Sequence, residues 1–435
     1  MKRWMAVLLT AALGVSLVGC AKPVEDLKQE NEKTPAAIET PENSAPPAGE
    51  TPAKPEPLQK LLRTASAPAA TDFSVRLLQN TLAAEGNTLV SPLSVLSALA
   101  MTANGARGET LAQMETVLGM DRETLNQWIR NYMAALPSEE RYKLSMANSI
   151  WYTDSDRFAV NPEFVRATVD SYDAGIYPTT FNDAACKAIN GWVEEHTDGR
   201  IRDILDSVSA DAVMYLVNAL AFEAEWQSIY KENQVRGGTF TTEDGREQKV
   251  ELMWSDENAY LEDEKAEGFL KYYTDRKYAF AALLPKEGVS VEEYVASLTG
   301  DHLHALLSAP REEPLKAAIP RFEATYKSEL SGNLMAMGMR DAFNPMAADL
   351  SGLGTMEGER LHISLVIHQT FLAVDERGTE AGAATVVGVK GPPAIPPQTN
   401  KEIVLDRPFV YMLIDCENSL PFFIGTAMDM AGTEK

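Results

Sequence analysis

Residues 374–389 read VDERGTEAGAATVVGV, and they lie between two predicted strands, residues 361–374 and 403–415. Successive side chains of a strand point to opposite faces. If the stretch became a strand, one face would carry charge only at its ends, at Glu380 and Lys390. The stretch could therefore be buried as a central strand without burying a charge, provided that its uncharged face points to the core. The other face would carry only small, uncharged side chains: Thr379, Ala381, Ala383, Thr385, Val387 and Val389.

The same stretch contains Gly382 and Gly388, which weaken a permanent strand. We therefore predict a segment that is a loop in one state of the molecule and a strand in another. A flexible Gly/Ala linker would be the better interpretation if the stretch stood alone, but other segments of the chain support the first interpretation.

Residues 376–385, ERGTEAGAAT, resemble the hinge of a serpin reactive-centre loop. The hinge residues are Glu376, Gly378, Thr379, Glu380, Ala381, Gly382, Ala383, Ala384 and Thr385. Other segments similar to serpin sequences follow in order over residues 69–430, and together they are a strong signal. They are NTLVSPLS (87–94), GARGET (105–110), INGWVEEHT (189–197), LVNALAFEAEW (216–226), IPRF (319–322), MGMRDAF (337–343), ADLSG (348–352) and RPF (407–409).

The resemblance implies an α+β serpin fold in a single domain, residues 69–431. Such a fold has a large central mixed β-sheet, smaller sheets, about eight or nine helices and an exposed reactive-centre loop, here residues 376–402. A chain of 435 residues that is 45% hydrophobic can bury one large core or two modest ones. Its net charge of −24 disfavours a nucleic-acid partner.

The N-terminus is typical of a secretory signal. Residues 1–19 begin with Lys2 and Arg3 and continue through an apolar run too short for a settled transmembrane helix. The segment LVGC, ending at Cys20, resembles a bacterial lipobox, which implies cleavage before Cys20 and diacylglycerol on its sulfur. A plain signal peptide with a chance cysteine is the alternative. We expect an exported protein, lipid-anchored at the bacterial cell surface or outer membrane.

Residues 20–68 are rich in Pro, Glu, Ala, Thr and Lys and show no apolar period, so we predict a disordered tether. The other two cysteines, Cys186 and Cys416, lie far apart in the sequence. They form either one disulfide or two buried free thiols.

The sequence contains no catalytic motif of the hydrolase or nucleotide-binding classes, so we do not expect an enzyme. His302 and His304 could ligate a metal, but without a neighbouring acid or cysteine pattern we interpret them as solvated residues. We therefore predict no cofactor and no metal site.

The resemblance assigns several residues to the place where the central strands part. Ser91, Ser94, Asn218 and His368 match a hydrogen-bonded cluster beneath the large sheet. Taken alone, Ser91 is a helix cap and His368 a satisfied core histidine, and both readings can hold together. The resemblance also places Trp226 at the top of the sheet, where insertion begins, and pairs Arg321 with Glu376 there.

The position of the reactive bond is open. The usual serpin spacing from the hinge leads to Pro392-Pro393, a bond that few serine proteases would accept. We choose Lys390-Gly391, because Lys390 is a cationic side chain directly after the strand-like stretch. Val389, Pro392 and Ala394 are the alternatives, and Lys390 could also be a solubilising charge only.

The resemblance implies a monomeric suicide-substrate inhibitor of serine endopeptidases. Cysteine endopeptidases are a second candidate class of target. The target protease would form a covalent complex with the cut loop, which inserts into the central sheet. Serpins usually have alanine where Gly382 stands, so we expect some inhibitor to be consumed as a substrate. The alternative is a non-inhibitory, surface-anchored binding protein on a serpin scaffold.

Overall fold

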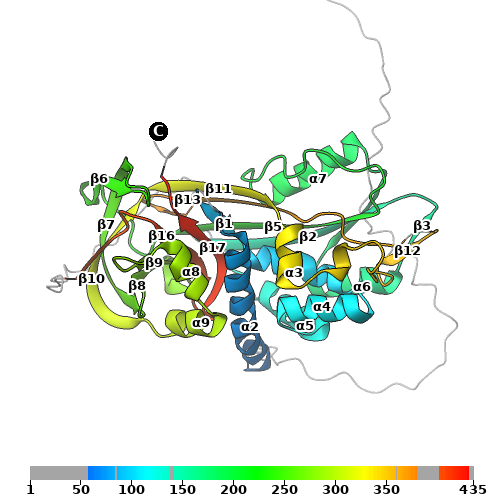
Figure 1. Ribbon diagram of the computed structural model, residues 1–435, viewed down its shortest axis with the longest axis horizontal. Helices are drawn as coiled ribbons and strands as arrows, with labels where there is room; N and C mark the ends of the chain where they lie inside the picture. Colours follow the sequence, from blue (N-terminus) through cyan, green and yellow to red (C-terminus); the bar gives the residue numbers. More distant parts are fainter. Residues whose placement is uncertain (1–56, 84–85, 138–141, 359, 380–400, 431–435) are drawn as a thin grey trace, which may run out of the picture.

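A computed structural model describes residues 57–83, 86–137, 142–358, 360–379 and 401–430. None of the helices in these ranges is both long and apolar enough to span a membrane. Nine α-helices lie in the described part (Figure 1): α2 (Pro57–Thr81), α3 (Pro92–Ala103), α4 (Gly108–Leu118), α5 (Arg122–Met133), α6 (Pro162–Tyr172), α7 (Asp183–His196), α8 (Val291–Ser297), α9 (Gly300–Ser308) and α10 (Ser331–Met337).

A six-stranded mixed sheet carries the site described below. Its strand order is β11-β13-β14-β5-β2-β4. The pairs are antiparallel except for β2 and β4, which run parallel. The strands are β11 (Phe322–Glu329), β13 (Ile367–Val374), β14 (Gly378–Thr379), β5 (Met214–Glu225), β2 (Tyr142–Thr153) and β4 (Gly175–Thr179).

A second, nine-stranded sheet forms the other half of the molecule. Its order is β1-β17-β16-β9-β8-β7-β10-β15, and β6 pairs with β7. These strands are β1 (Thr88–Val90), β6 (Val235–Thr241), β7 (Glu247–Glu262), β8 (Ala266–Tyr272), β9 (Tyr278–Pro285), β10 (Arg311–Pro320), β15 (Glu402–Val404), β16 (Phe409–Asp415) and β17 (Leu420–Ala427). A small third sheet pairs β3 (Phe158–Val160) with β12 (Gly354–Met356).

The six-stranded sheet is covered on both faces, with α7 on one side and α3 to α6 on the other (Figure 1). Alternate residues of β5 show how the two layers are built. Val217 and Ala219 pack into the cluster beneath α7, whereas Leu220, Phe222 and Ala224 pack into the main core. This alternation is the period-two pattern of a strand buried on both faces.

Three element boundaries differ from the sequence-based expectation. Strand β13 begins only at Ile367, because the backbone of residues 361–366 bonds outside the sheet, for example Ile363 N to Ala342 O. The predicted strand 403–415 is divided into β15 and β16, separated by a segment that includes Pro408, which has no amide hydrogen to donate. Helix α2 begins at Pro57, so residues 57–68 of the predicted tether are helical, with Ala67 fully buried.

Candidate functional site

The strands β5 and β13 are separated by a gap in the sheet, here called the lane, which β14 fills only at one end. Gly378 pairs with Glu225 and Thr379 with Ala224 on β5, while Thr379 also pairs with Val374 on β13. Below these pairs, no strand of the described ranges lies between β5 and β13. The facing edges of two central strands are therefore available to another strand.

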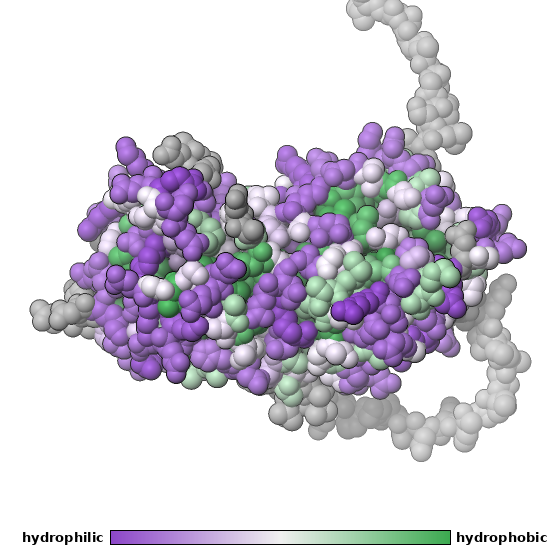
Figure 2. All heavy atoms as spheres, in the orientation of Figure 1, coloured by the Kyte–Doolittle hydropathy of each residue, from purple (hydrophilic) through white to green (hydrophobic). Residues whose placement is uncertain are grey.

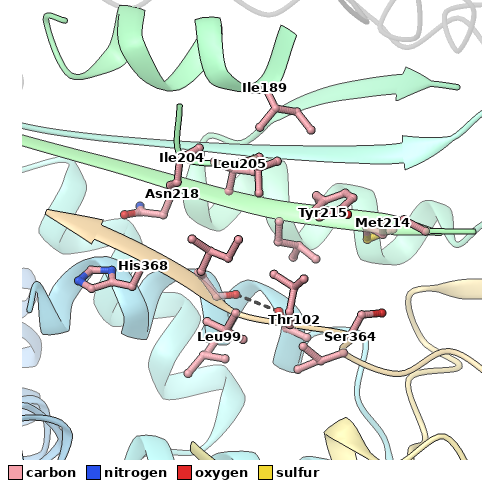
Figure 3. A pocket seen from close by; sticks show the side chains of 18 of the residues that line it. Leu99, Thr102, Ile189, Ile204, Leu205, Met214, Tyr215, Asn218, Ser364 and His368 are labelled. Atoms are coloured by element: carbon pink, nitrogen blue, oxygen red, sulfur yellow. Dashed lines mark hydrogen bonds between the residues drawn. The ribbon is translucent and has the colours of Figure 1, made fainter. Parts of the chain in front are cut away.

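A cavity of about 580 Å³ occupies this lane. Figure 3 shows lining side chains from β5, from β13 and from the α3 and α7 layers, with Asn218 and His368 on neighbouring strands. On the surface, hydrophobic residues gather below α7, as Figure 2 shows. The residues that line the cavity include Leu99, Thr102, Ile189, Ile204, Leu205, Met214, Tyr215, Asn218, Ser364 and His368.

Residues 375–379, here called the hinge turn, are held by residues 226–230, here called the bridge segment. The Trp226 indole Nε1 donates to Asp375 O at 2.8 Å, and Trp226 N donates to Arg377 O at 2.8 Å. Tyr230 N donates to Glu376 O at 3.0 Å. Three successive carbonyl groups of the hinge turn are therefore bound by two residues of the bridge segment.

Side chains also fix this end of the lane. Thr379 is fully buried, and its hydroxyl hydrogen-bonds the Tyr273 hydroxyl. Tyr273 in turn stacks on Trp226 with ring centroids 4.3 Å apart. Arg321 Nη1 lies 3.4 Å from Glu376 Oε1, an ion pair whose arginine is 41% exposed and which therefore contributes little to stability.

The predicted cluster is split into two halves across the lane. On one side, Ser91 N donates to His368 Nε2 at 3.0 Å, and the Ser91 hydroxyl accepts from Ser94 N at 3.3 Å as the cap of α3. Burial lowers the pKa of His368 to about 4, so the ring is neutral at pH 7. Because Nε2 accepts a hydrogen bond, Nδ1 carries the proton.

Asn218 forms the other half of the cluster. Its Nδ2 donates to Asn148 Oδ1 at 2.9 Å, and Ser97 Oγ donates to the same oxygen at 3.1 Å. The buried Asn218 Oδ1 has no hydrogen-bond partner among the residues that the structure describes. Asn148, on β2, was missed in the sequence, although a polar residue within a largely apolar stretch is a usable signal. Nothing in the sequence marked Tyr273 or Tyr230.

Several predicted residues lie outside the described ranges: Cys20, the hinge residues from Glu380 to Thr385, and the candidate reactive-bond residues Val389, Lys390, Gly391, Pro392 and Ala394. His302 Nε2 lies 3.0 Å from Asp263 Oδ2, and no group of metal-ligating side chains forms in the described part. Cys186 and Cys416 are both free thiols, which settles the open alternative against a disulfide. Burial raises the pKa of Cys416 to about 12.

Comparison with known proteins agrees with this geometry. The family pattern described as serpin (serine protease inhibitor) matches residues 68–430. An uncharacterized serpin-like protein of Thermococcus kodakarensis is 32% identical over 370 residues, covering 83% of this chain and 85% of the relative. The leukocyte elastase inhibitor of Bos taurus is 30% identical, covering 84% of this chain and 98% of its own length.

A solved structure of the thermophilic serpin tengpin in its native state is also similar. It superposes with a TM-score of 0.79 at 42% identity and covers 84% of this chain and 94% of its own. The three sheets and the nine described helices match the serpin fold implied by the sequence. Because the family pattern matches residues 68–430 and a relative is 32% identical over most of both chains, the chain belongs to the serpin family.

Proposed function

We propose that the protein acts as a suicide substrate that inhibits serine endopeptidases. Cysteine endopeptidases are a second candidate class of target. Serpins are mostly protease inhibitors rather than catalytic enzymes. One observation carries the proposal: Thr379 already lies between β5 and β13, at the first place of a strand that the described residues lack there. After a protease cuts the loop and forms the acyl-enzyme, the rest of the strand would follow Thr379 into the lane.

The register of β14 predicts where each loop residue would lie. Each step forward along the loop moves one residue back along β5 and β13 in an antiparallel pairing. Starting from Thr379 opposite Ala224 and Val374, Thr385 would lie between Asn218 and His368. Its hydroxyl could then donate to Asn218 Oδ1, the buried acceptor without a partner among the described residues.

The same register supports the choice of reactive bond. Val389 would lie opposite Met214, the first residue of β5, so the lane ends one residue before Lys390. A protease joined through the Lys390 carbonyl would be carried to the far end of the sheet. We therefore propose a trypsin-like protease as the target and Lys390-Gly391 as the bond.

Side-chain chemistry is compatible with insertion. Thr379 lies opposite Ala224, which packs in the main core, so the face that would enter the core is the uncharged one. Hydrogen bonds to two strand edges, at roughly 1 kcal/mol net each, plus apolar burial would supply on the order of ten kcal/mol or more. That free energy would have to be released before water completes hydrolysis of the acyl-enzyme.

We also propose that Cys20 carries the lipid anchor and that the inhibitor acts at the bacterial surface as a monomer. The support is the lipobox-like sequence before Cys20 and the tether-like composition that follows it. Metabolic labelling with a radioactive fatty acid, compared between the wild type and Cys20→Ala, tests this part independently of inhibition.

The test of inhibition is an SDS-stable complex with a trypsin-like protease. We expect Thr379→Arg to lose the complex while its loop is still cut, because the fully buried Thr379 site cannot accept a cation without a partner. Thr379→Ser, which keeps a small hydroxyl, is the matched control and should retain the complex. If the wild type is cut across a panel of proteases without forming the complex, the inhibitor proposal fails and the non-inhibitory binding protein is favoured.

A further inference from the structure

A buried lysine lies beneath the bridge segment. Lys271, on β8, is only 1% exposed. Its Nζ lies 4.3 Å from the centre of the Tyr230 ring and 5.3 Å from that of Trp226, and it reaches Ser228 O at 3.5 Å. One ammonium group therefore contacts three residues of the bridge segment, including both residues that bind the hinge turn.

The charge of Lys271 is balanced by Glu257 on β7. The Nζ–Oε1 distance is 2.9 Å, and the two side chains are 2% and 13% exposed. Ser255 Oγ donates to the same Glu257 oxygen at 2.7 Å and lies 3.3 Å from the Tyr230 hydroxyl. The anion is thus connected to the bridge segment as well.

A buried ion pair is weak support for stability, because desolvation offsets its attraction and an apolar pair often packs as well. A positional role is better matched to these contacts. A cation over two aromatic rings favours one arrangement of both rings. Here those rings belong to Trp226 and Tyr230, whose amide and indole groups bind the carbonyls of the hinge turn.

We propose that Lys271 and Glu257 are positioning residues for the hinge turn and thereby set how fast the cut loop enters the sheet. This inference rests on the proposed function. Insertion starts from Thr379, so an anchor that moves would delay the first new pairs of the strand. Slower insertion gives hydrolysis more time, and more inhibitor molecules are then consumed for each protease trapped.

The test variant is Lys271→Met/Glu257→Gln, which removes both charges and leaves no unpaired buried ion. The matched control is Lys286→Met/Glu262→Gln. It removes the Lys286–Glu262 pair at the end of β7, whose atoms lie 3.4 Å apart and which takes no part in the bridge-segment contacts described above. Arg311 Nη1 lies 2.8 Å from Glu262 Oε2 and keeps an acceptor in the glutamine oxygen. Lys271→Arg keeps a cation at the site and should behave as the wild type.

Amide hydrogen exchange directly measures how firmly the bridge segment holds the hinge turn, without any protease. In the test variant we expect the Trp226 and Tyr230 amides to exchange about ten-fold faster than in the control variant. Unchanged exchange at both amides would overturn the positioning role. This measurement decides the positioning role even if the wild type inhibits no protease and the proposed function fails.

The stoichiometry of inhibition measures the expected consequence, slower insertion of the cut loop. We expect the test variant to need at least about two-fold more inhibitor per protease than the wild type, with an unchanged rate constant for the initial attack on the loop. A purely structural role would lower the melting temperature but leave the stoichiometry at the wild-type value. That outcome would also contradict the proposal.

Discussion

His368 shows how one residue can connect the sheet to solution pH. It is buried on β13, and its Nε2 accepts a hydrogen bond from Ser91 N at the start of α3. Protonation of Nε2 would replace this bond with two opposed donors. The same ring lies where Thr385 would arrive on insertion, so its charge bears on both states of the molecule.

The first prediction concerns acid stability. The folded pKa of His368 is about 4, below the ordinary value of 6.5, so the unfolded chain binds more protons between these values. The unfolding free energy should therefore fall as the pH is lowered from 6.5 to 4, by up to about 3 kcal/mol from this residue. Urea unfolding over this pH range measures the effect.

The control for this prediction is His368→Gln, whose amide oxygen can still accept from Ser91 N without titrating. The difference between the wild type and the variant should change across pH 4 to 6.5. If that difference stays constant, the pKa of His368 is not lowered as described.

At the scale of elements, β14 is the shortest of the described strands and the one on which the proposed function depends. Gly378 pairs with β5 and Thr379 with both β5 and β13, and the bridge segment binds the hinge turn. Gly378 lies so close to β5 that a Cβ atom placed there would be 1.9 Å from Ala224 O. Only glycine fits at this point of contact, for reasons of space.

The second prediction compares two Gly→Ala substitutions in the same segment. Gly378→Ala should displace β14, lower the unfolding free energy by about 1–3 kcal/mol and raise the stoichiometry of inhibition, because overpacking a tight contact moves backbone. Gly382→Ala should instead lower the stoichiometry toward one, since alanine is the better strand residue. Titration of protease activity measures both, and equal effects of the two substitutions would contradict this account of β14.

At the scale of the whole molecule, the two covered faces of the six-stranded sheet decide what the lane can accept. α7 and α3 lie on opposite sides of it, and the cavity between them is open to a strand with small side chains. Among the described residues the sheet therefore lacks one central strand, which we propose that the loop supplies after cleavage.

The third prediction follows from that vacancy in the strand order. Cleavage of the loop should raise the melting temperature well above that of the intact protein, because the new strand pairs with β5 and β13. Calorimetry before and after limited proteolysis measures the change. Thr379→Arg, once cut, should show a much smaller rise, and an unchanged melting temperature in the cut wild type would leave no driving force for trapping a protease.

Much of the fold was accessible from the sequence because its signals are local. The cap of α3 by Ser91, the apolar run of β5 and the alternation after Val374 depend only on neighbouring residues, and the ordered serpin-like segments identified the family. Boundaries were less predictable: residues 361–366 have the composition of a strand, but their backbone finds partners outside the sheet.

The sequence by itself determined that residues 379–389 could be buried as a strand, since the absence of charge from one face is a property of alternation alone. Only the tertiary structure decided which residues surround the place that such a strand would take: Tyr273 at Thr379 and Asn148 beside Asn218, with Lys271 beneath the bridge segment. These contacts join segments far apart in the chain. They depend on the register of β5, β13 and β14, which the packing of whole layers sets and local sequence does not.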